Sequence, residues 1–265
     1  MTVESSAPAA DRRAGTPQGI TLVVTAFLPI MAIVSLAPAL PSIIKHFSAE
    51  PQALALSPLM ITAPGLMIAL LSPLMGWAAD KFGRRPVIVW ATFFYGFLGM
   101  LPFFLDKLVP IFASRLALGV AEAAILTVCN TLIADYFDDA RRRRWLTIQG
   151  IVGPVFGTSV IMIAGGLTDH FWNGAFLIYA VAFPIFCMML AFVFEPQVTA
   201  EREPANEEAE PFPWTTVLGL VAVTLFSAIL YYGFIVHGGL AYQAVGVTSP
   251  SRTGFLISIS SIGVF

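Results

Sequence analysis

The sequence predicts an all-α, polytopic membrane protein, and three observations support this class. Hydrophobic residues make up 57% of the 265 residues and charged residues only 11%, whereas a soluble domain carries about 25% charged residues. The mean hydropathy is +0.82. Apolar runs that are long enough to cross a hydrocarbon core of about 30 Å as helices recur along the whole chain.

Seven such runs are predicted to span the membrane. They cover residues 20–44, 56–79, 86–105, 109–134, 145–167, 171–194 and 212–236. Prolines and glycines within them are compatible with membrane helices, because neighbouring helices satisfy the freed backbone groups. An eighth run opens at Gly254 and is too short to cross, so we expect the chain to be truncated within a span.

The polarity of the chain divides it into four predicted parts. Residues 1–19, rich in Ala, Pro, Ser and Thr, are expected to be a disordered cytoplasmic tail, since the apolar run that follows is too long for a signal peptide. Residues 20–194 form a six-helix transmembrane bundle. Residues 195–211 are acidic and lack a hydrophobic period, which predicts a cytoplasmic linker. Residues 212–265 begin an incomplete second bundle.

The positions of lysine and arginine predict a cytoplasmic N-terminus. If the first span runs outward, ten of the 14 cations lie in cytoplasmic segments, three in external loops and one, Arg115, within a span. This bias follows the positive-inside rule and indicates a multi-pass protein of the plasma (inner) membrane. The run 141–144 lies between two spans, so we interpret it as a membrane anchor and not as a nucleic-acid patch.

The loop between the second and third spans has the most specific pattern. Gly76, Asp80, Gly83, Arg84 and Arg85 are spaced as in a tight, charged turn, in which Gly83 permits a sharp reversal of the backbone. A loop that only obeys the positive-inside rule explains the cations but not the spacing of the glycines and the aspartate. The pattern therefore indicates a functional turn at the cytoplasmic surface.

This segment resembles the G-x-x-x-D-[RK]-x-G-R-[RK] loop of the major facilitator superfamily. The resemblance implies a complete N-terminal six-helix bundle followed by the start of a second one, two bundles that rock about a central site, and no cofactor besides a proton gradient. In that family the aspartate is thought to cap a helix of the second bundle, and to pair with the loop arginine and with an acidic residue ending span 4. Asp135 matches that last position, so Asp80, Arg84 and Asp135 form an expected cytoplasmic latch.

The fourth span carries two charges on one helix face. Arg115, Gly119 and Glu122 are separated by four and three residues. Ionisable residues within a span usually face a partner or a water-filled cavity. Two interpretations remain open: an Arg115–Glu122 pair that fixes helix packing, or a proton-coupling site. The R-x-x-x-G pattern resembles a second motif of the superfamily and favours coupling, although Ala121 replaces a glycine found in some members.

The fifth span contains Gly153, Pro154, Gly157 and Thr158, which resemble the G-P-x-x-G-G motif of drug–proton antiporters with Thr158 in the last position. The same residues are typical of a small-residue packing face with a proline bend, and both interpretations stay open. Residues 32–35 lack the acidic residue that many such antiporters carry in the first span. Its absence counts against multidrug export and leaves Glu122 as the main coupling candidate.

We expect a secondary active transporter that moves a small organic solute by alternating access, with proton-coupled export favoured. Uptake or facilitated diffusion of a metabolite is the alternative, and a non-transporting sensor or inactive remnant is the alternative of another class. No catalytic set is visible, so an enzyme is disfavoured. Asn130, Tyr231 and Tyr232 are expected to line the substrate cavity. The expected partners are the solute, protons and the bilayer, without metal or nucleic acid, and we expect a monomer.

Overall fold

The computed structural model describes residues 14–196 and 213–262, and it is entirely helical over these ranges. The elements are α1 (Thr16–Ala26), α2 (Leu28–Val34), α3 (Leu40–His46), α4 (Ala53–Phe82), α5 (Arg84–Met100), η1 (Leu101–Phe104), α6 (Leu108–Tyr136), α7 (Asp139–His170), η2 (Gly174–Val181), α8 (Ala182–Phe192), α9 (Trp214–Ala244) and α10 (Pro250–Ile262). Seven helical stretches in the described ranges are long and apolar enough to cross a membrane. The predicted all-α polytopic class is thereby confirmed.

The first predicted span is broken into three helices instead of one. Pro29 and Pro41 stand in the first turns of α2 and α3, where the missing N–H of proline costs no helical hydrogen bond. The chain therefore restarts its helix twice within one crossing. The first helix also begins at Thr16, within the tail that was predicted to cover residues 1–19. Residues 1–13 of that tail lie outside the described ranges.

The helix that contains the fifth predicted span begins before that span. The helix α7 begins at Asp139, so the arginine run 141–144, interpreted as a membrane anchor, lies in its first two turns. Asp138 caps this helix, since its Oδ1 accepts a hydrogen bond of 2.9 Å from the backbone N–H of Arg141. Because a carboxylate satisfies an N–H that has no partner at a helix start, this cap allows the helix to begin in the polar segment.

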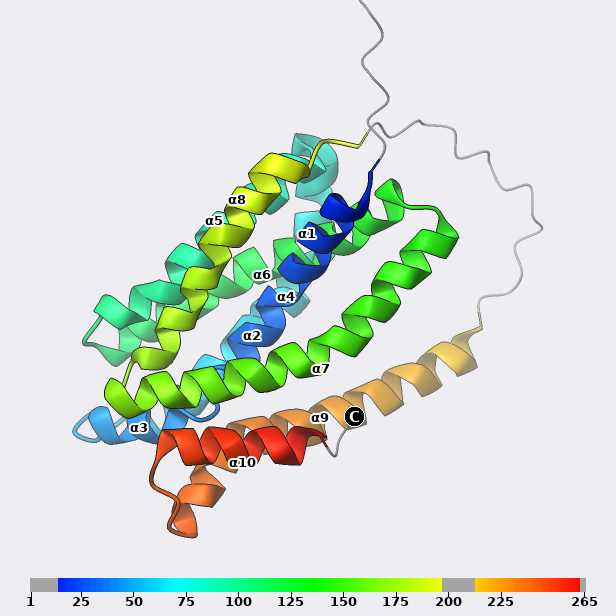
Figure 1. Cartoon of the computed structure of the whole chain (residues 1–265). Coiled ribbons are helices and arrows are strands. Elements are labelled where there is room, and N and C mark those ends of the chain that lie inside the picture. The colour runs from blue at the N-terminus through cyan, green and yellow to red at the C-terminus, as the bar shows by residue number, and fades with distance from the viewer. Residues whose placement is uncertain (1–13, 197–212, 263–265) are drawn as a thin grey trace, which may run out of the picture.

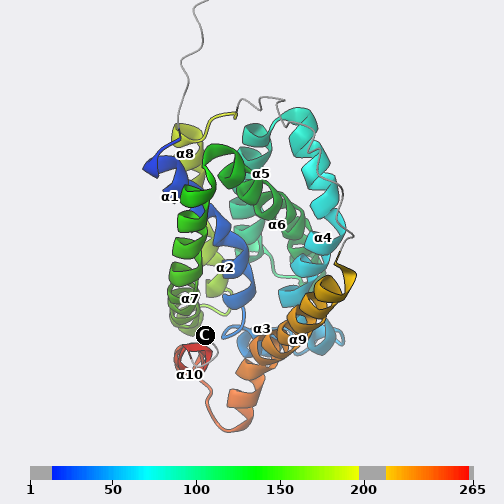
Figure 2. The same cartoon turned by 90° about the vertical axis from the view of Figure 1, so that its right-hand side faces the viewer.

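The helix α6 forms the centre of the first bundle and packs against α1, α4 and α5 (Figures 1 and 2). The two helices α6 and α4 approach closely at Gly119, where an added Cβ would lie 2.6 Å from Met67 Cβ and 2.7 Å from the carbonyl oxygen of Pro64. A glycine is needed at this crossing because any side chain would meet the backbone of the neighbouring helix. The buried face of α6, which includes Arg115 and Glu122, is thereby held deep inside the bundle.

The tightest described contacts of α9 and α10 with the first bundle lie towards one of its ends. A Cβ at Gly165 of α7 would lie 2.6 Å from the carbonyl oxygen of Pro250, and one at Gly239 of α9 would lie 2.7 Å from that of Ala37. Both contacts are at the end opposite the α4–α5 turn (Figure 1). The other end of α9, residues 214–230, is almost entirely exposed. The two parts therefore close at one end and separate towards the other.

Candidate functional site

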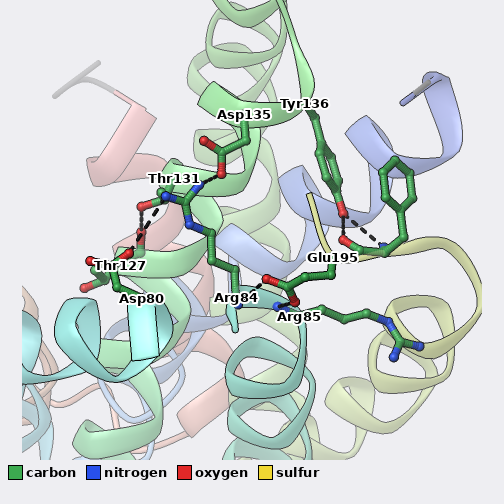
Figure 3. A network of polar contacts seen from close by, with 9 residues as sticks. Asp80, Arg84, Arg85, Thr127, Thr131, Asp135, Tyr136 and Glu195 are labelled. Atoms are coloured by element: carbon green, nitrogen blue, oxygen red, sulfur yellow. Dashed lines mark hydrogen bonds and ion pairs between the residues drawn. The ribbon is translucent and has the colours of Figure 1, made fainter. Parts of the chain in front are cut away.

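The α4–α5 turn and the end of α6 form one polar network (Figure 3). The guanidinium of Arg84 pairs with the carboxylate of Asp135, and its Nη2 lies 3.8 Å from Asp80 Oδ1. The Arg84 and Asp135 side chains are 15% and 22% exposed, whereas that of Asp80 is 73% exposed. The structure brings the three predicted latch residues together and leaves one carboxylate facing solvent. Gly76, one turn before Asp80, contacts α6, since a Cβ there would lie 3.7 Å from Thr127.

Sequence reasoning missed Glu195, which it assigned to the linker. Its two carboxylate oxygens accept hydrogen bonds of 2.7 and 2.8 Å from the backbone N–H groups of Arg84 and Arg85. Arg85 in turn donates from Nε to the carbonyl oxygen of Val193 at 2.7 Å. These bonds cap the first turn of α5 and attach it to the end of α8. The only sequence signal for Glu195 is that it directly follows the sixth apolar run.

The glycine of this turn has the conformation that its position requires. Gly83 has a φ of 95°, a left-handed value that other residues adopt only with strain. A Cβ at Gly83 would also lie 3.1 Å from Glu195 Oε2. Tyr136 strengthens the same corner, because its hydroxyl bonds the carbonyl oxygen of Phe194 and accepts from the Phe194 N–H at 3.0 Å. The turn, α6 and α8 are thus fastened together on one side of the bundle.

The charges within the fourth span are completely buried, at 0% exposure for both Arg115 and Glu122. Arg115 Nη2 donates to the carbonyl oxygens of Leu98 and Gly99, at 3.0 Å each. The guanidinium also lies 4.9 Å from the ring centre of Tyr179. Both oxygens of Glu122 lack a hydrogen-bond partner, and no ion pair joins the two side chains. One of the two interpretations of the sequence was a direct Arg115–Glu122 ion pair that fixes helix packing. The structure does not form this ion pair.

Buried tyrosines, which sequence reasoning also missed, connect this region to the broken first span. Tyr95 donates its hydroxyl to the carbonyl oxygen of Leu28 at 2.5 Å, and Tyr179 donates to that of Ala32 at 3.4 Å. The Ser35 hydroxyl donates to the Tyr179 oxygen at 3.5 Å. These contacts tie α5 and η2 to the backbone and side chains of α2 and its end. A tyrosine in the middle of an apolar run is the signal that could have indicated them.

A cavity of about 510 Å³ lies between α2, α6, α7 and α9. Its lining residues are Ile30, Ile33, Val34, Asn130, Leu146, Gln149, Gly150, Gly153, Pro154, Gly157, Thr158, Ile161 and Tyr231. Of the three predicted lining residues, Asn130 and Tyr231 contact this cavity. Tyr232 does not, because its hydroxyl is turned towards Gly65 on α4, 3.5 Å from where a Cβ would lie.

The small residues of α7 also line the cavity and do not make the tight helix contact that one interpretation predicted. A Cβ at Gly153 would lie 3.5 Å from the Phe27 ring, and one at Gly157 would lie 3.8 Å from Ile30. Both values are ordinary contact distances, because side chains and not backbone lie opposite. Pro154 lies inside α7, which remains helical through it. The tight approach occurs further along, at Gly165.

No metal site accompanies these features in the described ranges: no group of three or more His, Cys, Asp or Glu side chains is arranged to hold an ion. The chemistry available is that of hydrogen bonding, ion pairing and a buried carboxylate. The described chain thus combines one six-helix bundle, two further helices that close against it, and a cavity between them.

Comparison with known proteins decides the family. The model of the Major Facilitator Superfamily matches residues 22–265. The chain belongs to this superfamily. The seven helical stretches that are long and apolar enough to cross a membrane agree with membership of this superfamily of transporters.

Relatives include drug efflux proteins. The class D tetracycline resistance protein of Salmonella ordonez is 28% identical over 222 residues, which cover 79% of this chain and 53% of that protein. The multidrug efflux pump LfrA of Mycolicibacterium smegmatis is 28% identical over 198 residues, covering 69% of this chain and 36% of the pump. The chain spans about half the length of the tetracycline resistance proteins that it matches.

Solved structures show the same fold. A bacterial homologue of the human lysosomal transporter Spinster, in an inward-facing and unoccupied conformation, superposes with a TM-score of 0.71 at 16% identity, covering 95% of this chain and 62% of that one. A D-xylose–proton symporter superposes with a TM-score of 0.63 at 15% identity, covering 92% of this chain and 65% of the symporter. The major facilitator superfamily fold expected from the loop motif is thereby confirmed.

Proposed function

We propose that this chain carries the proton-coupling half of a secondary active transporter that exports a small organic solute in exchange for protons. The observation that carries the proposal is Glu122. Its carboxylate is fully buried near the middle of α6, and neither oxygen has a partner. An ionised carboxylate in such a site requires a counter-charge or water. Proton binding and release at Glu122 are therefore coupled to movements that open the surrounding helices.

The arrangement of the helices supports alternating access. We place the α4–α5 turn at the cytoplasmic surface of the plasma membrane, in accord with the positive-inside rule. The contacts of Gly165 with Pro250 and of Gly239 with Ala37 then close the external end, which fits a carrier that is open to the cytoplasm. Relatives that are described as efflux and resistance proteins support export as the direction.

The network around Arg84 fits a latch for the opposite state. In the cytoplasm-open arrangement, Asp80 is 73% exposed while Arg84 remains paired with Asp135. A carboxylate in this position is suited to the N-terminus of a second-bundle helix, where the helix dipole favours negative charge. Closing the cytoplasmic end would bury Asp80 against such a helix. The latch would then bias the equilibrium between the two states by the strength of this contact.

Transport in proteoliposomes tests the proposal. The protein is reconstituted, a proton gradient of either direction is imposed, and accumulation of a panel of solutes is measured for wild type, Glu122→Gln and the control Glu50→Gln. We expect gradient-driven flux that Glu122→Gln abolishes and Glu50→Gln preserves, since Glu50 lies in the α3–α4 connection. Flux that ignores both gradient and substitution indicates facilitated diffusion. Absence of flux across the panel favours a non-transporting protein.

A further inference from the structure

The cavity between α2, α6, α7 and α9 is uncharged. Its described lining contains no aspartate, glutamate, lysine, arginine or histidine, and the residues with polar side chains in it are Asn130, Gln149, Thr158 and Tyr231. Most of the remaining wall is aliphatic. A charged ligand would lose hydration here without gaining a counter-charge, which is costly. An uncharged ligand with an apolar body loses little hydration free energy here and is stabilised by the burial of its apolar surface.

The two amide side chains offer hydrogen-bond acceptors. Asn130 Nδ2 donates to the carbonyl oxygen of Leu126 at 3.0 Å, which fixes the amide and leaves its Oδ1 available. Gln149 Oε1 is buried in the cavity wall and accepts no hydrogen bond. A buried acceptor without a partner destabilises the site until a donor reaches it. Both amides therefore favour a ligand that presents N–H or O–H groups.

Three glycines of α7 give the cavity its room. Gly150, Gly153 and Gly157 are three and four residues apart, so they share one helix face. A Cβ at Gly150 would meet nothing within 4 Å, and Cβ atoms at the other two would make ordinary contacts. Helix packing therefore does not require a glycine at these positions. Larger side chains there would instead fill the space that the cavity now offers to a ligand.

We propose that this cavity binds an uncharged, largely apolar solute with at least one hydrogen-bond donor, which Asn130 and Gln149 recognise and for which Gly150 leaves room. This inference rests on the proposed transport function for the claim that the bound solute is the one carried. It adds a chemical class to that function. A volume of about 510 Å³ lies in the range of small-molecule sites.

Binding of three matched naphthalene derivatives tests the class. Radiolabelled naphthalene-2-carboxamide is neutral and donates two N–H bonds, naphthalene-2-carboxylate is an anion, and trimethyl-2-naphthylammonium is a permanent cation. Scintillation proximity on the purified protein measures saturable binding of each without imposing a gradient. We expect the carboxamide to bind at least about tenfold more tightly than either ion. Absence of saturable carboxamide binding, or equal or tighter binding of an ion, overturns the proposal.

Substitutions in the cavity wall locate the binding. We expect Asn130→Leu and Gln149→Leu each to weaken carboxamide binding about fivefold by removing an acceptor. We expect Gly150→Leu to abolish it by filling the cavity. Gly166→Leu is the matched control, because a Cβ at Gly166 also meets nothing within 4 Å on the same helix, outside the cavity. Equal effects of Gly150→Leu and Gly166→Leu on carboxamide binding would contradict the assignment of the binding site to this cavity.

The binding experiment and the transport experiment can give negative results independently of each other. Selective carboxamide binding without gradient-driven flux of the carboxamide would support the chemistry of the site and reject the proposed transport of its ligand. Gradient-driven flux of an ionic naphthalene derivative, lost in Gly150→Leu, would support transport and reject the uncharged class.

Discussion

Arg115 and Glu122 share a buried face of α6 but are not joined by an ion pair, since Arg115 donates instead to the carbonyl oxygens of Leu98 and Gly99 and both Glu122 oxygens lack partners. The two charges therefore have different tasks. The arginine fastens α6 to the end of α5. The carboxylate is available to respond to its surroundings, which is the property that a proton carrier needs.

Replacing Arg115 should lower stability. Lysine has a shorter side chain and no planar guanidinium, so it cannot both reach the two carbonyl oxygens that Arg115 Nη2 contacts and stack over the Tyr179 ring. We expect Arg115→Lys to reduce the free energy of unfolding by roughly 1.5–3 kcal/mol, the range for hydrogen bonds to a charged group. The midpoint of thermal unfolding in detergent measures this. The exposed Arg252→Lys serves as control, and equal midpoints for both variants would refute the fastening role.

Replacing Glu122 should separate stability from coupling. Glutamine has the same shape and removes the charge, and no partner is lost because the carboxylate has none in this conformation. We expect Glu122→Gln to leave the thermal midpoint unchanged or to raise it, while proton uptake coupled to ligand release disappears. Proton movement is measured with a pH-sensitive dye in weakly buffered detergent solution. A large loss of stability in Glu122→Gln would mean that the carboxylate is a packing element.

The lengths of most spans follow from the sequence because apolar residues must cover the hydrocarbon core. The run 109–134 predicts α6, which extends from Leu108 to Tyr136. Breaks within a run are not predictable in this way, because membrane helices tolerate proline. The first span therefore reads as one helix although Pro29 and Pro41 divide it.

The face that a membrane helix presents is equally hard to predict. The helix α9 is apolar around most of its circumference, so no periodicity distinguishes Tyr231, which lines the cavity, from Tyr232, which does not. The role of Glu195 depends on a contact with Arg84, 111 residues away in the sequence. The contact between Asp80, Arg84 and Asp135 could be predicted because a family motif includes these positions, whereas no motif includes Glu195.

Removing the Glu195 carboxylate should loosen the α4–α5 turn. Alanine at this position leaves the backbone N–H groups of Arg84 and Arg85 without their acceptor. We expect Glu195→Ala to cost roughly 0.5–2 kcal/mol, as for the loss of a helix cap. Hydrogen–deuterium exchange of the peptide covering 80–90 should become faster, while that of the peptide covering 108–120 should not change. Unchanged exchange in both peptides would show that water replaces the cap without loss.

The Asp138 cap should depend on pH. Hydrogen bonds from the Arg141 backbone and side chain lower the pKa of the Asp138 carboxyl below its ordinary value. A lowered folded-state pKa means that the stabilisation is present above the unfolded pKa and is lost as the pH falls through the folded value. We therefore expect the start of α7 to fray only in acid. Exchange rates of residues 139–143, corrected for intrinsic pH dependence, should rise at low pH in wild type but not in Asp138→Asn, where no titration occurs.

Asp169 should hold the external end closed. Its Oδ1 accepts hydrogen bonds from the Ser249 hydroxyl at 3.2 Å and the Ser251 N–H at 3.4 Å, so it joins the end of α7 to the start of α10. Alanine removes these acceptors and should shift the population towards external opening. A cysteine at Thr253, which is 3% exposed, reports this through its rate of labelling by a membrane-impermeant maleimide. We expect labelling to be several-fold faster with Asp169→Ala than with the control Asp106→Ala, whose aspartate lies in the connection before α6. Equal labelling in both backgrounds would show that the Asp169 hydrogen bonds do not hold this end closed and would leave the closure to the contacts at Gly165 and Gly239.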